Sequence, residues 1–492
     1  MGWCRSVKHH WEKQVVLLTA VAGAGKSAVA HTIAHRCAKE EILLSSFFFR
    51  TGGTTSPEHL FSSTAISLAK RDSSYRAILA SILEDAPSIA TATFDEQFRR
   101  LVLEPLRRRP LEDTPLIIVI DALDECDEGT SVTLAKLLRD EISGLPRTIK
   151  FLVTSRHTKV VDRYLLNKNS PSIYTLSIQL SDDGNLRDCD IYIRSQISEL
   201  KALCPMVDWP PDLQQRLSRH ARGLFVWVST TMDYVKNKSV NPVAALEDLL
   251  QEGAPRDDVP MEKNLDALYT AILMKCNWRD RTFRRNFPIV MGAIVTAKSP
   301  LSVKAWDALL SPLLHRTKSI EEIISELRPL FTGADEHSTS IQLLLHQSFQ
   351  DYLRWRIAPD IPPILRPAVG RERVALCCFQ VINTEIRKVA GLGVIERLGE
   401  RDVMPTISDG DISEPLAYAC RFALDHALEA KEGSEALKAE IKRFLDGSIL
   451  ESWLECCIRA ERYISIRPFF DWIQVSLGTS CQFSLTDALV LD

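Results

Sequence analysis

The sequence has no apolar run long enough to span a bilayer, no C-x-x-C motif and no detectable internal repeat. A membrane-crossing helix needs about 20 mainly apolar residues, so we expect no membrane span. The missing repeat argues against solenoid and propeller architectures. The N-terminus also lacks the apolar core of a secretory signal, which favours a cytoplasmic protein.

Cysteine is present, but without the spacing of a metal or redox site. The 12 cysteines are scattered, apart from adjacent pairs at 377–378 and 456–457. Reduced thiols in a cytosolic protein are the simplest interpretation. His31 and His35 lie one helical turn apart, but no third ligand accompanies them, which argues against zinc. The net charge of −4 argues against a general nucleic-acid-binding surface, so we expect no nucleic-acid partner.

The most informative segment is VVLLTAVAGAGKS at residues 15–27, an apolar stretch followed by a glycine-rich turn. It fits the phosphate-loop pattern G-x-x-x-x-G-K-[ST], with alanine in place of the first glycine. The two glycines permit a tight turn that points backbone N–H groups at phosphate oxygens. The lysine supplies a mobile charge for the phosphates, and the serine hydroxyl is a magnesium ligand. The predicted nucleotide-binding residues of this loop are Ala20, Gly23, Ala24, Gly25, Lys26, Ser27 and Ala28.

A second segment, PLIIVIDALDE at residues 115–125, provides acidic groups. It places Asp121 at the end of a buried strand, where the carboxylate can hold a magnesium shell. Asp124 and Glu125 follow at the strand tip, close to where an attacking water would lie. A phosphate loop alone arises by chance at a modest rate, but the two segments together are a strong signal for nucleotide triphosphate binding.

Residues 1–180 alternate apolar, strand-like runs with longer helical patterns. Such alternation predicts a parallel sheet with helices on both faces. Ligands of these sheets bind beyond the carboxyl ends of strands, where the phosphate loop, the acidic tip and Thr154–Arg156 all fall. The expected strands are 14–19, 43–49, 116–121, 149–154 and 173–179, and the expected helices are 26–38, 57–70, 95–108 and 130–143.

After residue 180 the strand pattern nearly vanishes and helical periodicity predominates. The run TSIQLLL at 339–345 is the one convincing strand, and it fits the β-element of a winged helix. The sequence therefore predicts an α/β P-loop NTPase domain followed by mainly α-helical domains that include a winged helix. Proline and polar breaks near 205–211, 253–260, 296–300 and 357–368 suggest domain boundaries.

Together these motifs resemble the NACHT domain of STAND-class P-loop NTPases, and are most similar to the large fungal group related to the nephrocystin-3-like N-terminal region. The resemblance covers almost the whole chain. The first two segments occur in many NTPases, whereas the later motifs narrow the resemblance to this family. The further motifs are FFFR at 47–50, IDALDEC at 120–126, FLVTSR at 151–156, GLFVW at 223–227, LDALYTAIL at 265–273, GAIVTAKSPLS at 292–302, LLHQSFQDYL at 344–353 and EPLAYACRFALDH at 414–426.

This resemblance implies an ATP/ADP-driven signalling switch. In such proteins the ADP-bound state is closed and inactive, and exchange for ATP opens the winged helix and permits ring-like homo-oligomers. They act in programmed cell death, NLR-like non-self recognition and innate-immunity-like signalling. The implied parts are a NACHT P-loop nucleotide-binding domain at 1–180, a first helical domain at 181–258, a winged-helix domain at 259–358 and a C-terminal helical segment at 359–492.

The resemblance also assigns roles to residues of the nucleotide-binding domain. Lys26 takes the phosphate role, while Ser27 and Asp121 resemble the magnesium ligands. Glu125 resembles the residue that activates the attacking water, with Asp124 as second choice. ATP or ADP with Mg²⁺ is therefore the implied ligand.

Three later positions resemble contacts that read the nucleotide state. Arg156 resembles the sensor of the γ-phosphate, and His346 the winged-helix histidine that touches the ADP β-phosphate. Gly223–Phe225 stand where related proteins place a Gly-x-Pro contact to adenine, but Phe225 replaces the proline. The residues alone leave other interpretations open: Arg156 as an exposed strand-end cation, His346 as a structural residue, and Phe225 and Trp227 as core.

Two functional hypotheses follow. The first is an ATP/ADP-switched signalling NTPase with slow hydrolysis, which the intact Lys26, Asp121 and Glu125 favour. The second is a non-catalytic or truncated scaffold that acts through protein–protein interaction. Little sequence precedes the first expected strand, and no WD or TPR repeats follow the last helices. We therefore expect effector and sensor functions to come from partners in trans or from missing terminal domains.

Overall fold

The computed structural model divides into two compact units, Met1–Leu268 and Tyr269–Asp492. The sequence-based division into four domains stays a prediction. The structure describes residues 1–6, 13–49, 59–86, 89, 92–108, 114–166, 172–237, 241–252, 261–314, 320–332, 344–357, 361, 367–393, 405–407, 410–430, 433–445, 448–460, 469 and 472–473.

A five-stranded, wholly parallel sheet forms the centre of the first unit, in the order β2-β3-β4-β1-β5. The inner strands β3, β4 and β1 are buried along their whole length, as expected of a parallel sheet covered on both faces. This confirms the predicted α/β fold class. The strands are β1 Val15–Thr19, β2 Leu43–Phe48, β3 Leu116–Asp121, β4 Ile149–Ser155 and β5 Ile173–Ser177.

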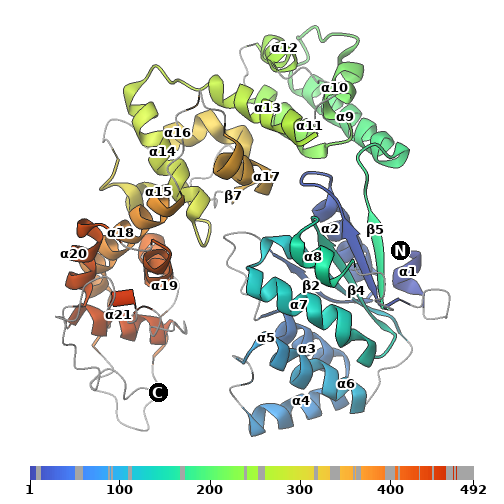
Figure 1. Ribbon diagram of the computed structural model, residues 1–492, viewed down its shortest axis with the longest axis vertical. Coiled ribbons are helices and arrows are strands. Elements are labelled where there is room, and N and C mark those ends of the chain that lie inside the picture. The colour runs from blue at the N-terminus through green and yellow to red at the C-terminus, as the bar shows by residue number, and fades with distance from the viewer. Residues whose placement is uncertain are drawn as a thin grey trace. The chain divides into compact units, whose positions relative to one another are not determined.

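Helices cover both faces of this sheet (Figure 1). Because successive strand residues point to opposite faces, Ile118 and Ile120 join a large core beneath helices α3 to α8, whereas Ile117 and Val119 join a smaller core beneath α1 and α2. The helices are α1 Gly2–Arg5, α2 Lys26–Lys39, α3 His59–Arg71, α4 Ser73–Asp85, α5 Phe94–Gln97, α6 Glu104–Arg108, α7 Glu128–Asp140 and α8 Lys159–Tyr164, and a π-helix at Phe98–Leu103 joins α5 to α6.

The predicted elements of this unit agree with the structure to within a few residues. The expected helix at 95–108 is continuous, but it contains the π-helical turn. The sequence analysis missed α4 and α8. Helix α4 begins where the Asp72 carboxylate accepts hydrogen bonds from two backbone N–H groups, a cap that separates it from α3 although the apolar pattern runs on.

The helices that follow the sheet include α9 Asp183–Leu203, α10 Leu213–Ala221, α11 Phe225–Lys236 and α12 Pro242–Glu252. The turn before α11 is held by Asn185, whose side-chain amide donates to the Leu180 and Gly223 carbonyls. Gly223 has φ +82°, and a Cβ atom there would lie 2.5 Å from the Leu180 oxygen. The sequence GLFVW therefore starts α11 at a position tied to the end of the sheet.

The second unit is mainly helical, as predicted. Helix α13, Met261–Met274, runs across the division between the units. Of the expected strand at 339–345, only Leu344–Leu345 falls within the described residues, and it pairs antiparallel with Phe331–Thr332. The other helices are α14 Arg281–Thr296, α15 Val303–Leu310, α16 Ile320–Leu327, α17 Gln347–Asp351, α18 Pro367–Glu385, α19 Glu414–Glu429, α20 Glu435–Phe444 and α21 Ser448–Arg459. Within the described ranges, no helix combines the length and apolarity needed to cross a membrane.

Candidate functional site

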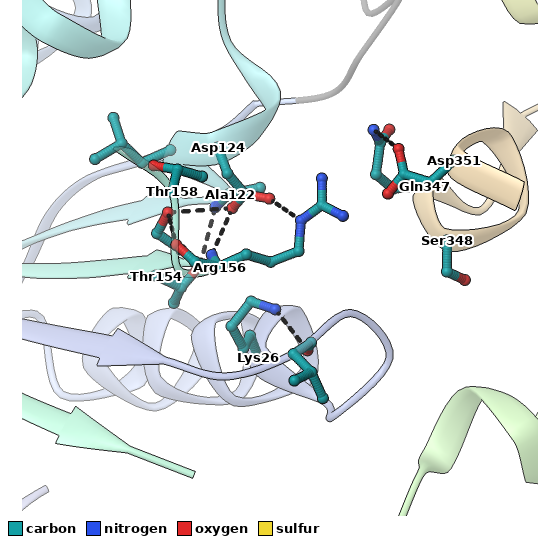
Figure 2. A network of polar contacts seen from close by, with 12 residues as sticks. Lys26, Ala122, Asp124, Thr154, Arg156, Thr158, Gln347, Ser348 and Asp351 are labelled. Atoms are coloured by element: carbon teal, nitrogen blue, oxygen red, sulfur yellow. Dashed lines mark hydrogen bonds and ion pairs between the residues drawn. The ribbon is translucent and has the colours of Figure 1, made fainter. Parts of the chain in front are cut away.

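The predicted phosphate loop connects the end of β1 to the start of α2. Gly23 and Gly25 have φ angles of +78° and +88°, in the left-handed region that favours glycine. Gly25 is the residue immediately before α2, so the first N–H groups of that helix border the loop. The Lys26 ammonium donates to the carbonyls of Ala20 and Val21, at 3.1 and 3.0 Å, and so folds over the loop (Figure 2).

The remaining loop residues divide by exposure. Ala20 and Ala24 are buried, which explains why small side chains stand there. Ser27 and Ala28 are exposed at the start of α2. The Ser27 hydroxyl is therefore accessible to a ligand, as a magnesium-binding serine requires.

Asp121 ends β3 and is 3% exposed. The Thr154 hydroxyl, on the neighbouring β4, donates a hydrogen bond to the Asp121 carboxylate. It also accepts one from the Ala122 N–H at 2.9 Å (Figure 2). Ala122 has φ +60°, so the chain turns sharply directly after the carboxylate. Thr154 thus orients Asp121 and supports the strained turn that follows it.

Asp124 is paired with Arg156 across the ends of β3 and β4. One carboxylate oxygen accepts from the Arg156 backbone N–H at 2.9 Å and from the Ser155 hydroxyl at 3.3 Å, and the other accepts from the Arg156 Nε at 2.5 Å. The Asp124 side chain is 3% exposed and that of Arg156 is 25% exposed. Arg156 is therefore held in a defined position by a buried carboxylate, and is not merely an exposed cation at a strand end.

Electrostatics show that these groups form one cluster. Burial lowers the pKa of Lys26, and the Asp124 carboxylate is the strongest charge acting in the opposite direction. Arg156 lowers the same pKa further, while Asp121 and Glu125 raise it. The fold therefore brings the predicted phosphate-binding lysine and the three acidic residues to the same edge of the sheet.

Helix α11 lies directly against the phosphate loop. The Val226 N–H donates to the Gly23 carbonyl at 3.2 Å. A Cβ atom at Gly23 would lie 2.1 Å from the Val226 Cγ1, and one at Gly25 would lie 3.6 Å from the Phe225 ring. The sequence analysis pointed to 223–225 as an adenine contact but missed Val226. The motif GLFVW was the available signal, but its spacing does not reveal which residue meets the loop.

The aromatic residues of this motif differ in their surroundings. Trp227 is 1% exposed and stacks near His220, with ring centroids 5.7 Å apart, so it belongs to the core. Phe225 is half-buried, and its ring centroid lies 5.8 Å from that of Tyr192. The packing interpretation holds for Trp227, whereas an adenine contact by Phe225 stays a prediction.

His346 lies in the second unit, immediately before α17. Its Nδ1 accepts a hydrogen bond from the Ser348 N–H at 3.2 Å and lies 2.6 Å from the Ser348 hydroxyl. The imidazole therefore caps the helix, as asparagine does in many proteins. Its assigned contact with the ADP β-phosphate stays a prediction.

Comparison with known proteins supports the first part of the resemblance. Residues 3–156 match the family model described as Nephrocystin 3, N-terminal, a range that includes the phosphate loop and ends at Arg156. The match covers less than half of the chain, so the NACHT assignment and a fungal source stay predictions. The search of curated proteins found no match.

Two solved structures show a distant similarity. Drosophila ORC bound to DNA is 12% identical with a TM-score of 0.28, covering 69% of this chain and 88% of that chain. Cdc6p from Pyrobaculum aerophilum is 12% identical with a TM-score of 0.31, covering 76% of this chain and 90% of that chain. At these scores neither similarity supports a conclusion about function.

The contact between Gly23 and Val226 predicts that alanine at position 23 destabilises the first unit. Alanine would have to adopt a left-handed backbone conformation there, and its Cβ would clash with Val226. Together these effects lower the free energy of unfolding by at least about 1 kcal/mol. Gly184→Ala in α9 is the matched control, because a Cβ there meets nothing within 4 Å. Chemical denaturation should show a loss of stability for Gly23→Ala and no loss of stability for the control. Equal stability of the two variants would contradict this account.

Proposed function

We propose that this protein is an ATP/ADP-binding signal-transduction NTPase of the NACHT/STAND class, with slow hydrolysis. The observation that carries the proposal is the convergence of Lys26, Asp121, Glu125 and Arg156 at the carboxyl edge of one parallel sheet. In sheets of this kind ligands bind at that edge. The family-model match to residues 3–156 supports the same conclusion.

The groups present suit a nucleotide phosphate chain. The glycine-rich turn and the first N–H groups of α2 offer backbone donors to the phosphates. The Lys26 ammonium now bonds to two loop carbonyls, and its flexible stem allows it to exchange these for phosphate oxygens. Arg156 supplies a second cation, held near Lys26 by Asp124.

The acidic residues suit magnesium and a water molecule. A Ser27 hydroxyl and an Asp121 carboxylate are the oxygen donors that Mg²⁺ prefers, and the bound ion would neutralise charge on the phosphates. Asp121 is already oriented by Thr154. Since both oxygens of Asp124 accept hydrogen bonds from the end of β4, we assign activation of the attacking water to Glu125.

The signalling role is the further part of this proposal. Closed protein would bind ADP, and exchange for ATP would open it and favour a homo-oligomer that gathers effector or sensor proteins. Proteins of the NACHT/STAND class act in programmed cell death and NLR-like innate immunity, and we propose the same processes for this protein. A ligand shifts such an equilibrium only if its contacts differ between the two states.

The alternative is a scaffold that keeps the fold without catalysis. The hydrogen bonds of Lys26 to its own loop and the pairing of Asp124 with Arg156 favour it, because both satisfy these side chains without a ligand. The alternative predicts no nucleotide in the purified protein and no effect of the substitutions below on ATP binding or hydrolysis.

Lys26→Ala should abolish nucleotide retention. Loss of a charge-assisted contact to phosphate costs up to about 3 kcal/mol. The measurement is nucleotide released on denaturation of purified protein, together with thermal unfolding in the presence of ADP, since a bound ligand stabilises the folded state. Lys39→Ala, at the exposed far end of the same helix, is the control and should behave as the parent. Equal occupancy in Lys26→Ala and the parent would refute the proposed phosphate site.

The two acidic roles should separate by substitution. Glu125→Gln should bind ATP normally but hydrolyse it more slowly, because the base is lost while the shape is kept. Asp121→Asn should instead weaken magnesium-dependent binding. Glu128→Gln, on the exposed first turn of α7, is the control. Binding by calorimetry and phosphate release would be measured; parent-like hydrolysis in both variants would favour the scaffold.

A third experiment tests the switch at His346. His346→Ala loses both the helix cap and the imidazole, whereas His346→Asn keeps a capping side chain and loses only the imidazole. If the imidazole contacts ADP, both variants should bind ADP more weakly by about 1–2 kcal/mol, with a smaller change for ATP, and should form more oligomer. Calorimetry and light scattering provide the measurements. A defect in His346→Ala alone would mean that the histidine is only a cap.

A further inference from the structure

Helix α1 contacts the C-terminal end of α2, which is the end remote from the phosphate loop. The Arg5 guanidinium forms two hydrogen bonds with the Glu40 carboxylate, of 2.8 and 2.6 Å, at the end of α2. The Trp3 indole donates to the Lys13 carbonyl at 3.0 Å. This four-residue helix is therefore docked along α2 by specific contacts and does not depend on apolar burial alone.

Docking of α1 places two thiols from different parts of the sequence in one small core. Cys4 in α1 and Cys37 in the last turn of α2 belong to the same small core, with exposed fractions of 2% and 0%. A hydrogen bond from the Cys37 thiol lowers the pKa of Cys4 to about 7. The same bond raises the pKa of Cys37, which donates it. The proposed nucleotide site contains neither of these two cysteines.

A buried lysine stands beside the two thiols. Lys150 points from β4 to the C-terminal end of α1, where its ammonium donates to the carbonyls of Trp3, at 2.6 Å, and Ser6. Lys150 is 3% exposed, and its positive charge also lowers the pKa of Cys4. A positive charge beside a thiol is the arrangement that makes a cysteine reactive, because the thiolate is the nucleophile.

Cys4 also lines a pocket of about 220 Å³ between α1, α2 and the sheet. The remaining lining is mainly apolar and includes Trp3 from α1, Val29 and Ile33 from α2, and Leu176 from β5. Leu176, on the edge strand β5, is 42% exposed and so lies at the rim. A small reagent can therefore reach Cys4 through this pocket, although Cys4 is closed off from the general surface.

We propose that Cys4 is a site of oxidation by hydroperoxides and that Cys37 resolves it to an intramolecular disulfide. In the first step the Cys4 thiolate attacks one peroxide oxygen. The S–O bond forms, the O–O bond breaks, and water or an alcohol leaves after taking up a proton. Cys4 is oxidised by two electrons to a sulfenic acid, and the peroxide is reduced.

In the second step the Cys37 sulfur attacks the Cys4 sulfur. Oxidation of Cys4 removes the thiolate whose hydrogen bond and charge raise the pKa of Cys37, so Cys37 ionises more readily at this stage. The S–S bond forms, the S–O bond breaks, and the oxygen leaves as water with the Cys37 proton. The resulting bond ties α1 to the last turn of the helix that begins at the phosphate loop. The modification thus encloses β1, the loop and α2 in one covalent ring that a reducing thiol can reopen.

The direct test is peptide mapping of the full chain after treatment with hydrogen peroxide. We expect a peptide that links Cys4 to Cys37 and that a reducing agent separates. In Cys37→Ser the sulfenic acid should persist and be captured by dimedone on Cys4, whereas Cys4→Ser should leave Cys37 unmodified. Circular dichroism checks the fold of both variants, and the result for the parent does not depend on them.

Cys126 is the internal control. It is more exposed than Cys4, but burial raises its pKa to about 12. We expect Cys126 to react at least about tenfold more slowly, because its thiolate is scarce. If peroxide oxidises Cys126 first, or yields no Cys4–Cys37 link in the folded parent, the proposal is wrong.

The role of the pocket has its own variant. Leu176→Trp places a larger ring at the rim and should slow the oxidation of Cys4 severalfold without changing the rate at Cys126. An unchanged rate at Cys4 would overturn the pocket as the route of entry. None of these experiments measures bound nucleotide, so their outcome is independent of the proposed NTPase function.

Discussion

Three parallel strands in register constrain the positions of the phosphate loop, Asp121 and Arg156. In β1, β4 and β3 the chain is buried on both faces, and Thr19 pairs with Ser155 at the same level of the sheet. The Ala20 N–H donates to the Ser155 carbonyl at 3.4 Å, so the phosphate loop starts where β4 ends. Because parallel strands carry their carboxyl ends to one edge, residues distant in sequence become neighbours there.

The charges at this edge are unevenly matched, and this bears on what can bind. Asp124 and Arg156 neutralise one another in a partly buried pair. Lys26 then faces both Asp121 and Glu125. An excess of carboxylate next to backbone donors and cations suits a divalent cation bound together with a polyphosphate, since neither ion alone would satisfy both sets of groups.

The parallel sheet and the position of Asp121 were predictable from the sequence, because continuous apolar runs and glycine spacing are local signals. The pairing of Asp124 with Arg156 was not, since nothing local shows that the end of β3 faces the end of β4 at these side chains. The same holds for Thr154, whose hydroxyl orients Asp121. Helix α8 was missed because a six-residue amphipathic segment resembles a loop when its cap is not recognised, and α4 was missed because the Asp72 cap that begins it was not recognised.

The hydrogen bond from Val226 to Gly23 has a consequence for biosynthesis. The sheet can assemble once β5 has left the ribosome, but the segment that covers the phosphate loop is translated only later. A nascent chain at the intermediate stage has its glycine-rich turn without the Val226 contact. The contact between Gly23 and Val226 can therefore form only late in vectorial synthesis, after the start of α11 has been translated.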